Sequence, residues 1–154
     1  MADAAPAVTL ERLRGTIRDL VSLTSGTEAA HLRRRPADGG WSPAVVLAHL
    51  AHAEHVNGVR LRMVVTQDEP LLAAFDEQAW ADRLAPLEDD PRDTLARWRV
   101  LRDDTLRVLE SVTAEEWGRV GMHQERGRLT LGQLAAVLAD HDAAHLDQLR
   151  AALR

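Results

Sequence analysis

The feature that most constrains the fold is a helical repeat of apolar side chains in the last segment, Thr130 to Arg154. Positions three or four apart share one face of a helix, so the repeat predicts a helix with one buried side. The members of that side are Leu134, Leu138, His141, His145, Leu149 and Leu153. Two imidazoles one turn apart therefore lie in an apolar stripe, where their nitrogens can converge on a metal ion.

The His-x-x-x-His pair alone leaves two interpretations open. Such a pair on a helix is more often a pair of packed histidines than a binding site. Zinc or nickel needs at least three protein ligands to be held firmly. The metal hypothesis therefore depends on a third ligand elsewhere in the chain.

The composition favours helices throughout the chain. Its 154 residues have the length of one domain, and 45% of them are hydrophobic and 28% charged, as in ordinary globular proteins. Valine and isoleucine are less frequent than alanine, leucine or arginine, tyrosine is absent, and only one phenylalanine occurs. Helix propensity thus outweighs strand propensity. We expect an all-α fold in which residues 1–154 form a single domain.

Charge and composition argue against several classes of partner. The net charge of −5 disfavours nucleic-acid binding, and the only basic run, Arg33-Arg34-Arg35, has no interleaved aromatic residues. There is no cysteine, so neither a disulfide nor a cysteine nucleophile is available. The N-terminus lacks a targeting pattern, and no apolar run approaches the length of a membrane span. We expect a cytoplasmic protein with neither a nucleic-acid nor a membrane partner.

Caps and breakers divide the chain into four long helices joined by shorter segments. The expected long helices are 9–25, 43–66, 91–112 and 130–154, with short helical pieces at 27–35 and 113–117. The expected N-caps of the long helices are Thr9, Ser42, Asp90 and Thr130, and Thr27 caps the first short piece. Prolines 43 and 91 suit the first helical position, where a missing N–H costs nothing.

Two connections are expected to lack long helices. Residues 67–89 are interrupted by Pro70 and Pro86, and we interpret them as a loop with a short helical turn. A connection of this length is either a lid over a site or a packed crossover that Phe75 and Trp80 anchor. Residues 118–128 are interpreted as a second loop.

The second long helix offers His49, His52 and His55 as further ligands. Positions three apart turn by about 60° in projection, so at most two of these side chains face one site. His49 lies early in its helix, whereas His141 and His145 lie late in theirs. If the two helices run antiparallel, these three histidines occupy the same end of a bundle.

Motifs along nearly the whole chain resemble the DinB-like superfamily of metal-binding four-helix proteins. They are Trp41-Ser42, His49-Leu-Ala and Asp140-His141-Asp-Ala-Ala-His145-Leu-Asp-Gln148. The segment Phe75-Asp-Glu-Gln-Ala-Trp80 further resembles the aromatic-Asp-Glu-Lys-Ala-Trp segment of the YfiT-like metal-dependent hydrolases, also described as bacillithiol S-transferases. The related mycothiol-dependent maleylpyruvate isomerases share the layout, and the motifs do not choose between these groups.

This resemblance implies an up-down-down-up bundle with a zinc or nickel ion bound by His49, His141 and His145. The histidines that do not match ligand positions are His31, His52, His55 and His123. Three imidazoles leave one or more metal positions open, as in catalytic centres.

Two chemistries fit such an open centre, and a third hypothesis involves none. In the leading hypothesis, a low-molecular-weight thiol of the bacillithiol or mycothiol kind coordinates the metal, loses its proton more readily and attacks an electrophile as a metal-bound thiolate. In the alternative, a bound water loses its proton and hydrolyses an ester or amide. In the third hypothesis, the chain is a non-catalytic dimerising helical module. The sequence leaves monomer and homodimer open.

Several other residues are candidates for supporting roles. Arg60 lies about 20° from His49 in projection and can meet a carboxylate of a thiol substrate or pair with an acid. Gln148 can orient a ligand or a bound thiol, and His52 is either a proton shuttle or, as we favour, a packed side chain. Candidate acceptors for ligand N–H groups are Glu54, Glu77 and Asp142.

Overall fold

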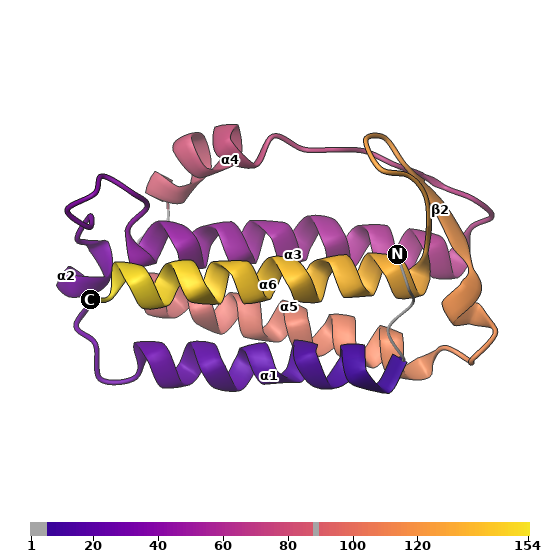
Figure 1. Ribbon diagram of the computed structural model, residues 1–154, viewed down its shortest axis with the longest axis horizontal. Helices are drawn as coiled ribbons and strands as arrows, with labels where there is room; N and C mark the ends of the chain where they lie inside the picture. Colours follow the sequence, from indigo (N-terminus) through magenta and orange to yellow (C-terminus); the bar gives the residue numbers. More distant parts are fainter. Residues whose placement is uncertain (1–5, 88–89) are drawn as a thin grey trace.

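Four long helices make up the main body of the structure, a computed structural model that describes residues 6–87 and 90–154 (Figure 1). They are α1 (Pro6–Thr24), α3 (Pro43–Thr66), α5 (Pro91–Ser111) and α6 (Leu131–Ala152). The expectations for residues 1–5 and for a boundary at Asp89 fall outside the described residues. No helix in the described part of the chain combines the length and the apolar character that crossing a membrane requires.

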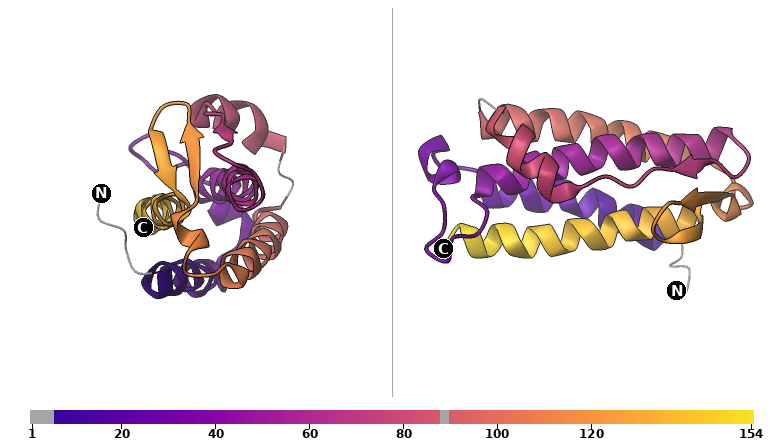
Figure 2. Two further views of the ribbon diagram at one scale, coloured as in Figure 1. Left: turned by 90° about the vertical axis from the view of Figure 1, so that its right-hand side faces the viewer. Right: turned by 90° about the horizontal axis from the view of Figure 1, so that it is seen from above.

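The four long helices form the expected up-down-down-up bundle. Helices α1 and α6 run in one direction, and α3 and α5 run in the other (Figure 1). Seen from its end in Figure 2, the bundle has one helix at each corner. Helix α3 packs against α5 and α6, and α1 packs against the same two helices. Because α3 and α5 are parallel, the chain must return along the whole bundle between them, and this return connection carries several short elements.

The predicted helix starts are confirmed for three of the long helices. The side chains of Ser42, Asp90 and Thr130 each accept a hydrogen bond from an amide in the first turn of the helix that follows. Helix α1 differs, because it begins at Pro6 and Thr9 lies buried inside it. Proline is well suited to the first helical position, so the start moves upstream of the predicted cap.

The segments between the long helices contain more regular structure than expected. Helix α2 (Ala29–Arg33) lies within the predicted piece, although Glu28 rather than Thr27 occupies its N-cap position. The return connection contains β1 (Leu71–Leu72), α4 (Glu77–Leu84) and the 3-10 helix η1 (Ala85–Leu87). The side chain of Asp76 caps α4. The predicted helical turn is therefore a helix of 8 residues.

The prediction of a loop over residues 118–128 was wrong. After the 3-10 helix η2 (Glu116–Gly118), the chain forms an antiparallel hairpin of β2 (Val120–His123) and β3 (Gly127–Thr130), and β1 pairs with β2 in parallel. A Cβ atom at residue 121 would lie 2.7 Å from the side chain of Leu72 and 2.8 Å from that of Val64. Glycine at this position therefore allows β2 to pack closely against β1 and α3.

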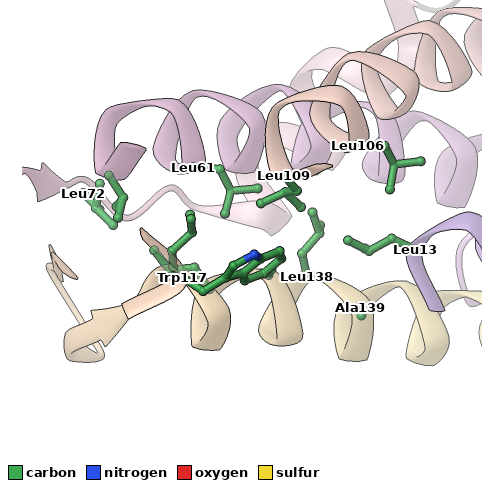
Figure 3. Packing of buried hydrophobic residues seen from close by; sticks show 12 residues of the cluster. Leu13, Leu61, Leu72, Leu106, Leu109, Trp117, Leu138 and Ala139 are labelled. Carbon is green, nitrogen blue, oxygen red and sulfur yellow. The ribbon is translucent and has the colours of Figure 1, made fainter. Parts of the chain in front are cut away.

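The apolar core consists of two clusters along the bundle. Figure 3 shows the cluster at the hairpin end, which includes Leu13, Leu61, Leu72, Leu106, Leu109, Trp117, Leu138 and Ala139. The cluster at the opposite end includes Leu20, Val46, Leu47, Leu50, Trp98, Leu146 and Leu149. Both clusters draw side chains from all four long helices, so the bundle is held along its length by apolar burial.

A buried ionic network centred on Arg102 connects these helices. The guanidinium donates to Glu54 Oε2 from Nε at 2.9 Å and from Nη2 at 2.6 Å, and to Asp142 Oδ2 from Nη1 at 2.6 Å. It also stacks over the ring of Trp98, with Cζ 4.8 Å from the centroid. The network therefore ties α5 to α3 and α6 through fully buried charges.

Candidate metal centre

His49 on α3 and His141 and His145 on α6 meet inside the bundle. Because α3 and α6 run antiparallel, the early part of α3 lies beside the late part of α6 (Figure 1). One ring nitrogen from each histidine lies within 4.8 Å of the others, and the Nε2 atoms of His49 and His141 are 2.8 Å apart. The structure thus brings together the three residues predicted as ligands, which we call the three-histidine cluster.

Gln148 and Trp41 determine how the ring of His145 is oriented. Gln148 Oε1 accepts a hydrogen bond from His145 Nδ1 at 2.8 Å, which leaves the lone pair on Nε2. The ring of Trp41 lies nearly parallel to that of His145, with an interplanar angle of 8° and centroids 6.2 Å apart. Gln148 thus occupies the orienting position predicted for it. No such role was predicted for Trp41.

The protonation of the cluster suits a divalent cation. His49 is buried, and this burial lowers its pKa to about 3, with further lowering from His145, His141 and His52. Burial likewise lowers the pKa of His145. Both imidazoles are therefore neutral at pH 7, with a lone pair available. Neutral imidazole nitrogens directed at one point form a donor set that fits zinc or nickel.

Two of the three predicted acidic supports lie beside the cluster. Glu77, at the start of α4, places Oε2 3.9 Å from His49 Nε2. Asp142 Oδ1 lies 3.7 Å from His141 Nδ1. Burial disfavours the charged form of Asp142, but the charge of Arg102 and its hydrogen bond outweigh this effect, so the pKa of Asp142 is lowered. Asp142 is thus a carboxylate positioned behind a ring of the cluster.

Glu54 does not have the predicted role. Its Oε2 accepts two hydrogen bonds from Arg102, and no hydrogen bond joins it to the cluster in residues 6–87 and 90–154. A buried guanidinium requires compensating charge. Glu54 supplies that charge together with Asp142, so its carboxylate pairs with Arg102 and not with a histidine of the cluster.

The remaining histidines, His31, His52, His55 and His123, lie outside the three-histidine cluster. The ring of His52 packs edge-on against Trp80, with centroids 5.7 Å apart, in agreement with the favoured packing role. This contact also places α4 on the outer side of α3. As a result, the segment that resembles the YfiT-like proteins carries Glu77 to the cluster.

A cavity of about 410 Å³ opens beside the cluster, and we call it the site cavity. His141 and Glu77 line it, as do residues of the return connection and of the β2–β3 hairpin. Its other lining residues include Asn57, Arg60, Phe75, His123, Glu125, Arg126, Leu134, Val137 and Leu138. No role was predicted for the hairpin side chains, because their segment was interpreted as a loop.

Arg60 lies in the wall of the site cavity. Of the two roles predicted for it, pairing with an acid is wrong. Its Nε and Nη2 atoms donate to the carbonyl oxygen of Ala73, and its Nη1 donates to Asn57 Oδ1 at 3.2 Å. No carboxylate of the described residues lies within 4.0 Å of its guanidinium. Arg60 therefore anchors the return connection to α3.

Comparison with known proteins places the chain in a family. A family model described as the DinB superfamily matches residues 12–149. A Geobacillus kaustophilus protein named "Putative metal-dependent hydrolase" is 34% identical over 145 residues, covering 89% of this chain and 78% of that protein. An Oceanobacillus iheyensis protein with the same designation is 29% identical over 112 residues, covering 70% of this chain and 62% of that protein.

A solved structure agrees with this assignment at the level of the fold. It is described as YfiT from Bacillus subtilis, "a probable metal-dependent hydrolase with an unusual four-helix bundle topology". It superposes with a TM-score of 0.86 at 20% identity, covering 99% of this chain and 87% of that chain. With the family model matching most of its length, the chain belongs to the DinB superfamily.

Proposed function

We propose that this protein is a metal-dependent enzyme that transfers a low-molecular-weight thiol, of the bacillithiol or mycothiol kind, to an electrophile. The observation that carries the proposal is the convergence of His49, His141 and His145 beside a cavity of about 410 Å³. A bound zinc or nickel ion would lower the pKa of a thiol that it coordinates. The cavity volume falls within the range of small-molecule sites, roughly 300–1,000 Å³, so it accommodates an organic thiol and not only water.

The side chains around the cluster have distinct tasks in this reaction. The three histidines would hold the ion, and Gln148 keeps the proton of His145 on Nδ1, away from it. Glu77 lines the site cavity, 3.9 Å from His49 Nε2, and would accept the proton that the thiol loses. The sulfur then forms its bond to the electrophilic carbon, and the leaving group departs with its electron pair.

Hydrolysis is the second candidate, and the position of Glu77 favours it. A carboxylate beside an open metal position can accept a proton from water as well as from a thiol. The names of the two relatives agree with this reaction. In this case the site cavity would hold the ester or amide.

Activity measurements on the zinc-loaded and nickel-loaded full chain separate these reactions. We expect conjugation of monochlorobimane that depends on added thiol and disappears both in the chelated protein and in the His145→Ala variant. Ester or amide cleavage without thiol-dependent conjugation would replace the transferase proposal with the hydrolase one. Absence of both activities and of bound metal would leave a non-catalytic helical module, and sedimentation analysis would then test whether it dimerises.

A further inference from the structure

Two arginines are fully or almost fully buried in the described part of the chain, and their surroundings differ. Arg102 has carboxylate oxygens of Glu54 and Asp142 at 2.6 Å, and these raise its pKa although burial acts in the opposite direction. Arg60 is 8% exposed and has no such partner. Burial lowers the pKa of Arg60, and the charges of Glu125 and Glu77 offset this only in part. A buried cation without a counter-ion is costly, so a nearby anion would be stabilised.

The guanidinium of Arg60 is held firmly in the wall of the site cavity. Two of its nitrogens donate to the carbonyl oxygen of Ala73, and a third donates to Asn57. Its Cζ lies 5.7 Å from the centre of the Phe75 ring. These neutral contacts fix the position of the positive charge without neutralising it. The orientation is therefore set before any ligand arrives.

A second buried donor lines the same cavity. His123 is 7% exposed, and its Nδ1 accepts hydrogen bonds from the backbone amides of Glu125 at 3.2 Å and Arg126 at 3.3 Å. These bonds require the lone pair on Nδ1, so the proton of the neutral ring is on Nε2. Burial and the charges of Arg60 and Arg126 lower the pKa of His123 and keep it neutral. No residue of the described ranges is seen to accept from Nε2–H.

The other charges of the site cavity restrict the kind of anion. The exposed cation Arg126 lines it, and so do the acids Glu77 and Glu125, whereas a third acid, Asp140, is paired with Arg12 at 2.6 Å. Glu77 and Glu125 would repel a doubly charged phosphate more strongly than a singly charged carboxylate. A carboxylate also has two oxygens, one for each of the two buried donor groups, the guanidinium of Arg60 and the imidazole of His123.

The α6 wall of the site cavity indicates what lies between the bound group and the three-histidine cluster. Along α6 the cavity extends from His141 to Leu134, seven residues or about 10 Å. Three of the side chains that line it along this stretch are apolar, Leu134, Val137 and Leu138, and the acid among them, Asp140, is paired with Arg12. We propose that Arg60 and His123 bind a carboxylate of the substrate, whose other end reacts at the histidines, with an apolar chain along the α6 wall between the two. This inference rests on the proposed function, since it deepens the description of its substrate.

Two thiols of equal length test the carboxylate site. 8-Mercaptooctanoate and 8-mercaptooctanol differ only in the group at the far end, and calorimetry on the zinc-loaded full chain gives both dissociation constants. We expect the carboxylate to bind at least about tenfold tighter, as a charged hydrogen-bonding group does over a neutral one. Arg60→Gln should abolish this preference. Arg128→Gln should retain it, because Arg128 is exposed and pairs with Glu69 at 2.8 Å.

A second measurement does not depend on the variant folding or on metal. In the metal-free wild-type chain, octanoate should shift the imidazole Nε2 resonance of His123 in nitrogen NMR spectra, whereas octanol should not. Equal affinities for the two thiols, a folded Arg60→Gln protein that keeps the preference, or an unchanged His123 resonance would each overturn the inference. Thiol-dependent conjugation with 8-mercaptooctanol tests the proposed function separately, because that thiol lacks the carboxylate.

Discussion

The Nδ1 atom of His145 lies 2.8 Å from Oε1 of Gln148, one helical turn further along α6. This hydrogen bond fixes both the tautomer and the direction of the ring. Gln148→Ala should therefore lower the affinity for zinc by about 10- to 100-fold, measured by competition with a chromophoric chelator. Asp147→Ala is the matched control, because Asp147 is exposed and pairs with Arg150 outside the cluster. An unchanged zinc affinity in Gln148→Ala would show that the hydrogen bond does not support a ligand.

Glu77 is expected to accept a proton during the reaction and not to contribute to substrate binding. Glu77→Gln should lower kcat for thiol conjugation by on the order of 10²-fold, because the amide cannot accept the proton. The acidic limb of the pH–rate profile should be altered as well. Asp82→Asn on the same helix should keep the wild-type rate, since Asp82 is exposed and bonds only to Gln78 in the described chain. A Glu77→Gln enzyme with wild-type kcat and pH profile would remove Glu77 from the reaction.

The ionic network around Arg102 should matter for stability. Arg102→Met leaves Glu54 and Asp142 buried without their counter-charge, so the free energy of unfolding in urea should fall by about 3–5 kcal/mol. Arg107→Met is the comparison on the same helix, because Arg107 is exposed and pairs only with Asp104 at 3.2 Å in the structure. Its effect should stay within about 1 kcal/mol. Equal effects of the two substitutions would contradict the network's role.

The metal-free protein should lose stability in acid partly through His49. The pKa of His49 is about 3 in the folded chain because of burial, whereas the ordinary value is 6.5. Between these pH values the unfolded chain binds a proton that the folded chain does not, so the free energy of unfolding rises with pH across this window. The contribution is complete above pH 6.5 and is lost as the pH falls toward 3.

Urea titrations of the chelated wild type and of His49→Gln between pH 4 and pH 7 check this effect. The variant should show a shallower dependence on pH, with a difference of up to a few kcal/mol over the window. His31→Gln serves as the control, because His31 lies at the surface near Arg34. Parallel curves for wild type and His49→Gln would contradict the buried, neutral state of His49.

The long helices could be predicted from local patterns, whereas the order of helix directions and the choice of His49 as the third ligand came from the family resemblance. Caps and apolar spacing define the long helices, and antiparallel packing of α3 and α6 then brings His49 beside His141 and His145. The proximity of the three rings was therefore accessible from the sequence. The spacing of the two residues on α6 supplied the strongest signal.

Features that depend on contacts between distant segments were not predictable in the same way. Arg102 finds its partners 48 and 40 residues away, and nothing in its own helix indicates that it is buried. The β2–β3 hairpin was missed because its strands are only 4 residues long and contain Gly121 and few β-branched side chains. With the hairpin missed, the contribution of His123 to the site cavity could not be foreseen.

The most direct test of the central claim is the metal content of the purified full chain, measured by mass spectrometry of the elements. Wild-type protein prepared without chelator should contain about one zinc or nickel ion per chain. His49→Ala, His141→Ala and His145→Ala should each lose it, and His31→Ala should retain it. A wild-type chain without stoichiometric metal, or a cluster variant that keeps the full amount, would contradict a shared ion at the three histidines.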